Sequence, residues 1–168
     1  MPIADFESWR RELISTGRMA QDGDPAEVWE QSEAQVARYL ELLELARGVY
    51  EKEVFKALLD SMQVEDDYEV YETTIGLLLS FPFEQFGPYL AEYFPEFLAR
   101  DKERAADFLS LMVNYAKDGG KEIVEFKNAV RNSDRASREV IQGFVKLQEK
   151  PGGWLDNKPG WYDDILPV

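Results

Sequence analysis

Two residue types are missing from the sequence: its 168 residues include no cysteine and no histidine. The absence of cysteine excludes disulfides, thiolate nucleophiles and the zinc or iron–sulfur sites that need cysteine ligands. The absence of histidine excludes Ser–His catalysis and removes the commonest ligand of transition metals. Any catalysis would therefore have to rely on carboxylate, lysine, tyrosine or hydroxyl groups.

Long apolar runs are also missing. The N-terminal segment MPIADFESWRRELIST carries a charge every few positions and lacks the apolar stretch of a signal peptide. No later run approaches the ~20 apolar residues that a membrane span needs. We therefore expect a cytoplasmic protein that does not bind a membrane.

Positive charge is absent from one long stretch of a chain that has 33 acidic and 19 basic residues and a net charge of -14. Between Ala57 and Ala99 there is no Lys or Arg. The acidic residues of this stretch are Asp60, Glu65, Asp66, Asp67, Glu69, Glu72, Glu84, Glu92 and Glu96. From Arg100 to Lys150 the basic residues outnumber the acidic ones. One flank of the molecule is therefore predicted to project negative potential.

A negative field repels nucleic acids and anionic lipids, because proteins bind both through Lys and Arg. It attracts basic proteins and speeds their encounter by about 10 to 10³-fold at low salt. Acidic surfaces also serve simply to keep proteins soluble, and composition alone leaves both interpretations open. We expect no direct binding of DNA or RNA.

Apolar residues make up 45% of the chain and aromatic residues 13%, which is enough to form a hydrophobic core. The length corresponds to one ordinary domain. We predict a single helical domain over residues 1–150, to which an irregular tail over residues 151–168 belongs.

The first helix is predicted from Ile3, Phe6 and Leu13, which recur near a helical period. Gly17 stands where a left-handed C-terminal cap is expected. Together these residues predict a helix that ends at Gly17.

Asp24 and Pro25 have the order of an N-cap and a first helical residue. Strong helix formers follow, and they predict one long helix over residues 26–47 that Gly48 ends or bends. A third helical segment is predicted over residues 49–62.

Residues 64–82 predict a further helix, in which Asp66 and Glu69 have the spacing of a capping box. Glu65, Glu69 and Glu72 are four and three residues apart, so their carboxylates are predicted to line one helix face. Such a row of like charges is either tolerated or marks a binding edge.

Residues 83–97 carry an apolar stripe that two prolines interrupt. Pro88 is expected to start a helix and Pro95 to kink or restart it. Asp101 is predicted to cap the next helix, which Gly119 and Gly120 close. The apolar residues of this next helix are Ala105, Phe108, Leu109, Met112 and Ala116.

Two more helices are predicted before residue 150. The first carries Ile123, Phe126 and Val130. The second begins near Ser133 or Asp134, and its predicted buried residues are Val140, Ile141, Phe144 and Val145.

These segments predict an all-α fold of seven or eight helices, and their short links favour stacked antiparallel hairpins. After Lys150 the helical pattern stops in a segment rich in Pro and Gly. This tail still contains many apolar residues, so we expect it to pack across the helices.

The run YEVYETTIGLLLSFP, followed by FEQFGPYLAEYFPEFLARDKERAADFLSLMVNYAK, resembles consecutive helical pairs of the HEAT type. More narrowly, it is similar to the small all-α immunity proteins of bacterial polymorphic toxins, including those of contact-dependent growth inhibition systems. The resemblance covers roughly residues 65–132. It implies a cytoplasmic protein that binds one cognate toxin domain, often a basic nuclease, and blocks its active site or a nearby surface.

We therefore predict an immunity protein, not an enzyme, that is a monomer when unbound and neutralises a basic toxin domain through its acidic surface. The predicted contact residues are Glu65, Asp66, Asp67, Glu69 and Glu72, with Trp161, Tyr162, Asp163 and Asp164 of the tail in reserve. The same acidic row could instead be a solvated face. We expect no catalytic residue, metal ion or cofactor.

Two alternatives remain open. One is a metal-dependent all-α nucleotide pyrophosphohydrolase, whose Mg²⁺ ligands would be carboxylates at ExxE spacing. The candidate pairs are Glu27 with Glu30, Glu41 with Glu44, and Glu69 with Glu72. The other alternative is a general helical adaptor that presents a concave surface to protein partners.

Overall fold

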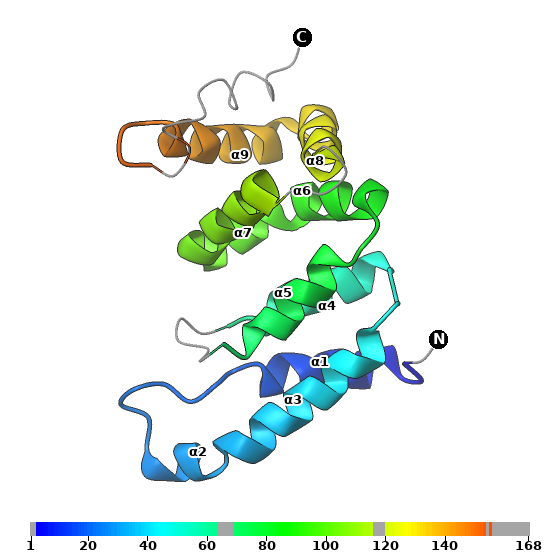
Figure 1. The fold of residues 1–168 in the computed structure, drawn as a ribbon, viewed down its shortest axis with the longest axis vertical. Helices are drawn as coiled ribbons and strands as arrows, with labels where there is room; N and C mark the ends of the chain where they lie inside the picture. The colour runs from blue at the N-terminus through cyan, green and yellow to red at the C-terminus, as the bar shows by residue number, and fades with distance from the viewer. Residues whose placement is uncertain (1–2, 64–68, 116–119, 154, 156–168) are drawn as a thin grey trace. The chain divides into compact units, whose positions relative to one another are not determined.

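The computed structural model of the protein describes residues 3–63, 69–115, 120–153 and 155, apart from the side chains of Glu27, Glu122 and residues 111–115. In this part of the chain it contains nine α-helices and no β-strand (Figure 1). They are α1 (Phe6–Thr16), α2 (Ala26–Glu30), α3 (Ser32–Ala46), α4 (Lys52–Ser61), α5 (Tyr71–Leu79), α6 (Phe83–Arg100), α7 (Lys102–Tyr115), α8 (Lys121–Asn132) and α9 (Arg135–Gln148). The predicted all-α class is confirmed.

The chain divides into two compact units, Met1–Phe81 and Pro82–Val168. The first unit contains α1 to α5 and the second contains α6 to α9. The grouping of all helices into one domain over residues 1–150 stays a prediction.

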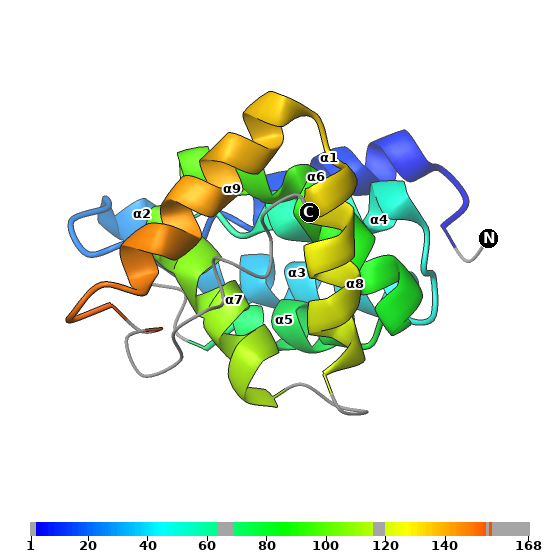
Figure 2. The same cartoon turned by 90° about the horizontal axis from the view of Figure 1, so that it is seen from above.

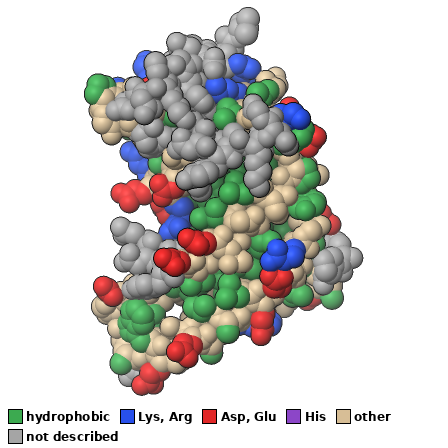
Figure 3. Space-filling view, in the orientation of Figure 1, with side chains coloured by type: hydrophobic (Ala, Val, Ile, Leu, Met, Phe, Trp, Pro, Cys, Tyr) green, Lys and Arg blue, Asp and Glu red, His purple; other side chains and the backbone are tan. Residues whose placement is uncertain are grey.

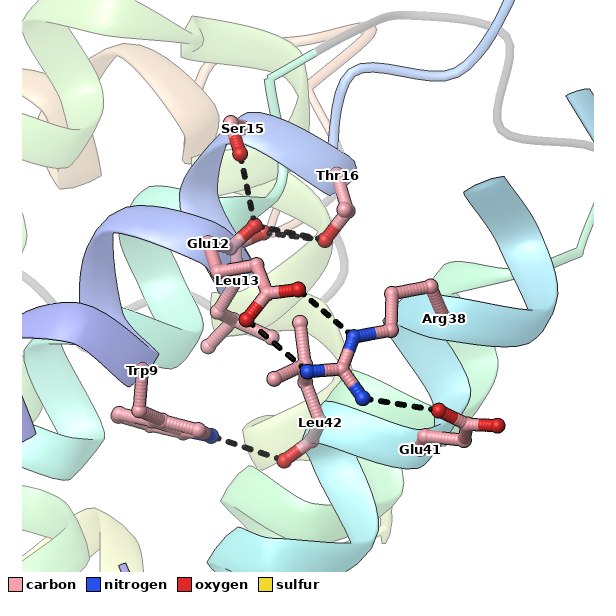
Figure 4. Close-up of polar contacts among 8 residues, drawn as sticks. All are labelled: Trp9, Glu12, Leu13, Ser15, Thr16, Arg38, Glu41 and Leu42. Atoms are coloured by element: carbon pink, nitrogen blue, oxygen red, sulfur yellow. Dashed lines mark hydrogen bonds and ion pairs between the residues drawn. The ribbon is translucent and has the colours of Figure 1, made fainter. Parts of the chain in front are cut away.

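In the first unit, α1 packs against α3 and α4, and α5 packs against the same two helices. The indole of Trp9 in α1 donates to the carbonyl oxygen of Leu42 in α3 at 2.9 Å. On the surface, the Arg38 guanidinium holds Glu12 through two hydrogen bonds of 2.7 and 3.0 Å (Figure 4). These contacts join α1 to α3 across both the core and the rim.

A cluster of hydroxyl groups lies inside this unit. The Tyr39 hydroxyl lies 2.7 Å from Ser61 Oγ and 2.6 Å from Thr74 Oγ1, and all three residues are buried. Ser61 Oγ also donates to the Leu58 carbonyl at 2.8 Å. The cluster links α3, α4 and α5, and it satisfies polar groups whose burial would otherwise be unfavourable.

Gly17 ends α1 in a right-handed conformation (φ -68°, ψ -17°), so the predicted left-handed cap is wrong. A Cβ atom at this position would lie 2.0 Å from the Ser61 carbonyl oxygen. Glycine is required here because α1 and the end of α4 approach too closely for a side chain.

The predicted helix over residues 26–47 is interrupted at Gln31, so the described residues contain more helices than the seven or eight expected. No Gly or Pro marks the break. It lies beside the segment after α1, because Gln35 Nε2 donates to the carbonyl oxygens of Thr16 (3.1 Å) and Arg18. Gly48, with φ +77°, follows α3 as predicted.

Asp24 does not cap α2, contrary to the prediction. Its carboxylate accepts a hydrogen bond from the Gln21 backbone amide at 3.0 Å and pairs with Arg18 at 3.6 Å. α2 begins after Pro25 without a side-chain cap. The carboxylate therefore orders the loop before the helix.

In the second unit, α6 packs against α7, α8 and α9. Phe94 lies at the centre, with ring centroids 5.9 Å from Phe126 and 5.8 Å from Phe144. α8 and α9 lie at a steep angle to each other in both views (Figures 1 and 2). The unit thus has its own aromatic core.

α6 continues through both Pro88 and Pro95, so the predicted helix start at Pro88 and the predicted restart at Pro95 are wrong. The alternative of a kink at Pro95 stays a prediction. Each proline removes one backbone donor from the helix. The buried residues of α6, which outweigh that loss, are Phe86, Gly87, Leu90, Ala91, Phe94 and Phe97.

The predicted cap of α7 and the predicted start of α9 near Ser133 or Asp134 are confirmed. Asp101 Oδ1 accepts from the Arg104 amide at 2.9 Å, and Asp134 Oδ1 accepts from the Ser137 amide at 2.9 Å. Val140, which was predicted to be buried, is 45% exposed because it lies on the outer side of α9.

The start of the tail folds back on the end of α9. The Leu155 amide donates to the Gln148 carbonyl at 3.0 Å, and the Leu155 side chain is buried. Residues 156–168, for which the same packing was predicted, lie outside the described residues. Across the part of the chain that is described, no helix combines the length and apolar character needed to cross a membrane.

Candidate partner-binding site

Two of the nine predicted contact residues, Glu69 and Glu72, lie within the described residues. The others lie outside them: Glu65, Asp66, Asp67, Trp161, Tyr162, Asp163 and Asp164. Of the predicted acidic row, the structure therefore describes only the C-terminal end, Glu69 and Glu72.

Glu69 does not belong to a right-handed helix. It is exposed and has φ +69°, and it is the one described residue other than glycine with a positive φ. Its carbonyl accepts from the Glu72 amide at 3.2 Å, in the turn that leads into α5. The predicted helical row is therefore wrong at Glu69, although Glu69 and Glu72 remain neighbours across this turn.

The acidic residues between Ala57 and Ala99 are not equivalent. The Asp60 side chain is only 14% exposed and pairs with Lys56 at 3.2 Å and Arg10 at 3.7 Å, so α1 and α4 neutralise its charge. Glu69, Glu72 and Glu84 are exposed and have no ion-pair partner among the described residues. The predicted negative flank therefore includes Glu69 and Glu72 but not Asp60.

A pocket of about 150 Å³ lies beside Glu69. Its described lining residues come from three segments: Met19 and Ala20 after α1; Trp29, Ser32, Gln35 and Val36 of α2 and α3; and Val70 before α5. The break between α2 and α3 places Trp29 in this wall, where it is 40% exposed. The pocket is mainly apolar and opens to solvent.

Two segments that lack positive charge meet at this pocket. Residues 19–37 contain no Lys or Arg and five acidic residues, and Val70 belongs to the stretch between Ala57 and Ala99. The nearest base in the sequence, Arg18, pairs with Asp24. Figure 3 shows acidic and hydrophobic side chains together over α2, at the lower left, with no basic side chain among them.

Sequence reasoning missed this pocket. The absence of bases in residues 19–37 was visible in the sequence and could have drawn attention to the segment. Its meeting with Val70 could not be predicted, because it depends on contacts between distant residues.

Hydrogen bonds around Tyr71 bring the walls of the pocket together. The buried Tyr71 hydroxyl donates to the Gly17 carbonyl oxygen and accepts from the Gln63 amide at 3.0 Å. The first bond lies two residues before Met19, and the Tyr71 backbone directly follows Val70. The start of α5 is thereby anchored to the segment after α1.

The polar lining of the pocket offers hydrogen-bond acceptors. Both hydrogen bonds of the Gln35 side chain are made by Nε2, so Oε1 is its remaining hydrogen-bonding atom. The Ser32 hydroxyl makes no side-chain hydrogen bond to any described residue. Gln35 Oε1 and Ser32 Oγ can therefore accept from a ligand that carries donors.

A second pocket, of about 360 Å³, lies in the other unit. Its described lining residues are Pro88, Ala91, Glu92, Ala129, Ser133, Asp134 and Ser137. The Asp134 carboxylate is occupied by α9, since it accepts from both the amide and the hydroxyl of Ser137. This occupation leaves the second pocket the weaker candidate.

Within the described residues, no group of three or more carboxylates is close enough to hold a metal ion. The side chain of Glu27, which belongs to one of the predicted ExxE pairs, lies outside this description. Glu41 accepts from Arg38 at 2.9 Å, and Glu44 accepts from Arg47 at 2.8 Å. The hydrogen bond from Arg47 lowers the pKa of Glu44. Both carboxylates thus serve as partners of arginines on the surface.

Comparison of the chain with protein-family models, with curated proteins and with solved structures finds no match. The candidate site is therefore supported by its own geometry and charge.

Proposed function

We propose that this protein is an immunity protein, which binds a basic toxin domain and neutralises it through the acidic surface around Glu69 and Glu72. The resemblance to small all-α immunity proteins suggests the class of partner. The observation that carries the proposal is the meeting of two base-free segments at a solvent-open apolar pocket, beside carboxylates without ion-pair partners among the described residues.

The combination of an apolar centre and charged surroundings supports protein binding. Binding energy at protein interfaces is concentrated in a few desolvated residues, with Trp, Tyr and Arg enriched among them. Charges around such a centre steer the encounter and select the partner. In this protein, Trp29 supplies the aromatic centre, and Glu69 and Glu72 supply the surrounding charges.

The backbone at Glu69 gives further support. A left-handed conformation is unfavourable by about 1–2 kcal/mol for a residue with a Cβ, and glycine adopts it readily. Strained residues of this kind cluster at functional sites, where the side chain is needed. The proposal explains why glutamate occupies this position.

The proposal is tested by co-expressing the protein with the toxin domain encoded beside its gene. We expect growth to be restored and the two proteins to purify as a complex. If growth is not restored and no complex forms with the purified domain, the proposal is wrong.

Replacement of Glu72 by lysine tests the surface itself. We expect Glu72→Lys to slow association with the toxin domain about tenfold at low ionic strength and to reduce its salt dependence. Glu53→Lys is the matched control, because Glu53 is also exposed and also lies in the first turn of its helix, α4. Equal association rates for both variants, measured by stopped-flow mixing, would exclude Glu72 from the interface.

A further inference from the structure

We infer that the pocket beside Trp29 holds the side chain of one lysine or arginine of the partner protein. The inference rests on the proposed function and specifies how the partner is recognised. It follows from four properties of the pocket, which are its volume, its walls, its acceptors and its surrounding charge.

The volume corresponds to one side chain. A cavity of about 150 Å³ holds a molecule such as benzene, whereas pockets for cofactors and other small-molecule ligands have about 300–1,000 Å³. A nucleotide or a folded peptide segment would not fit. A single side chain projecting from a partner surface would.

The walls match the two parts of a basic side chain. Met19, Val36 and Val70 offer apolar contacts to an aliphatic stem, which lysine and arginine bury while their charged ends stay near water. The wall also contains Trp29, which is 40% exposed, and aromatic rings attract ammonium and guanidinium groups.

The hydrogen-bond acceptors in the pocket favour a side chain that carries N–H donors over a purely apolar one. Lysine and arginine carry three and five N–H donors and no acceptor. Such donors can bond Gln35 Oε1 and Ser32 Oγ. Leucine or methionine would remove these oxygens from water without replacing their hydrogen bonds, which is unfavourable.

The surrounding charge favours the same occupant. The segments that form the pocket contribute acidic residues and no bases, and Glu69 adjoins the lining residue Val70. A negative net charge in these segments favours a cation over an acidic side chain in the pocket.

The pocket can be tested in the full-length protein without the toxin. Amide and indole NMR signals are followed while Nα-acetyl-lysine amide or Nα-acetyl-arginine amide is added at millimolar concentrations. The control is Nα-acetyl-norleucine amide, which has a similar aliphatic stem and no charge. Trp29→Phe assigns the Trp29 indole signal.

We expect both basic compounds to shift the signals of Trp29, Val36 and Val70, and norleucine amide to shift them at least tenfold less at equal concentration. Equal shifts with norleucine amide would show an apolar site and overturn the inference. The absence of any shift with the basic compounds would overturn it as well.

Filling the pocket tests its role in the complex. We expect Val36→Phe to weaken toxin binding about 30-fold, the effect of losing one central contact. Ala37→Phe is the control, because Ala37 neighbours Val36 on α3 but does not line the pocket. Circular dichroism confirms that both variants fold.

The two proposals fail separately. If the wild-type protein binds the toxin domain and both variants bind it equally, the pocket inference is wrong and the immunity function stands. If the basic compounds bind the pocket but no toxin complex forms, the immunity function is wrong.

Discussion

Gly17 lies where the end of α1 approaches the backbone at the end of α4. A Cβ atom at Gly17 would clash with the Ser61 carbonyl, and the Gly17 carbonyl oxygen accepts a hydrogen bond from the Tyr71 hydroxyl. A side chain here would push α1 away from α4. The absence of a side chain at Gly17 therefore permits the close packing of α1 against α4.

We predict that Gly17→Ala lowers the free energy of unfolding by about 1–3 kcal/mol, because overpacking of this size is relieved only by moving backbone. Gly76→Ala is the opposite case, since Gly76 lies in α5 with open space around it. That variant should gain about 1 kcal/mol from helix propensity. Urea denaturation measures the free energy of unfolding of both variants. Equal values for Gly17→Ala and Gly76→Ala would contradict the predicted clash between residue 17 and the Ser61 carbonyl.

Single residues with local roles were predictable from the sequence. Asp101 and Gly48 act within a few positions of themselves, so spacing alone identified them. The start of α9 was predicted near Ser133 or Asp134, and the structure shows that Asp134 caps it. Gly17 and Glu69 were misread because distant contacts determine their conformations. The pocket was missed for the same reason.

Among the helices, α6 and the pair α2 and α3 show opposite effects of the surrounding fold. α6 continues through two prolines because its apolar face is buried, whereas the predicted long helix breaks at Gln31 without a helix-breaking residue. Periodicity identified where helices exist. It could not predict their continuity, which tertiary contacts decide.

The N-terminus of α9 gives a pH-dependent prediction. Hydrogen bonds from the Ser137 hydroxyl and amide lower the pKa of Asp134 below its ordinary value of 3.8. The folded protein therefore holds this proton less tightly than the unfolded chain. The resulting stabilisation is complete above the ordinary pKa and is lost as the pH falls through the lowered one.

We predict that Asp134→Ala is less stable than the wild-type protein at pH 7, and that the difference shrinks as the pH is lowered below about 4. Asp134→Asn should keep most of the cap at both pH values, because an amide oxygen also accepts from the helix. Chemical denaturation at each pH measures the free energy of unfolding of the wild-type protein and of both variants. A difference that is independent of pH would exclude the charged cap.

For the molecule as a whole, net charge is the dominant electrostatic property. A net charge of -14 leaves many carboxylates without counterions, and their mutual repulsion disfavours the compact state. The ion pairs that are present, such as Arg38 with Glu12, lie mostly on the surface, where they contribute little. Repulsion should therefore exceed attraction.

We predict that the melting temperature rises as NaCl is increased from about 0.01 to 0.15 M, because the screening length falls from about 30 to 8 Å. Differential scanning calorimetry across this series is the measurement. A falling melting temperature would mean that surface ion pairs outweigh the repulsion.

The hydrogen bond from Tyr71 to Gly17 acquires a further meaning at this scale. It joins Gly17, which precedes the base-free residues 19–37 by one residue, Arg18, to Tyr71 of the base-free stretch between Ala57 and Ala99, and it does so through uncharged groups. Arg18 itself pairs with Asp24. In the absence of a ligand, the hydrophobic core therefore holds the two base-free segments together against their electrostatic repulsion. A cation bound between the segments reduces this repulsion. Binding of the cation should therefore stabilise the folded protein.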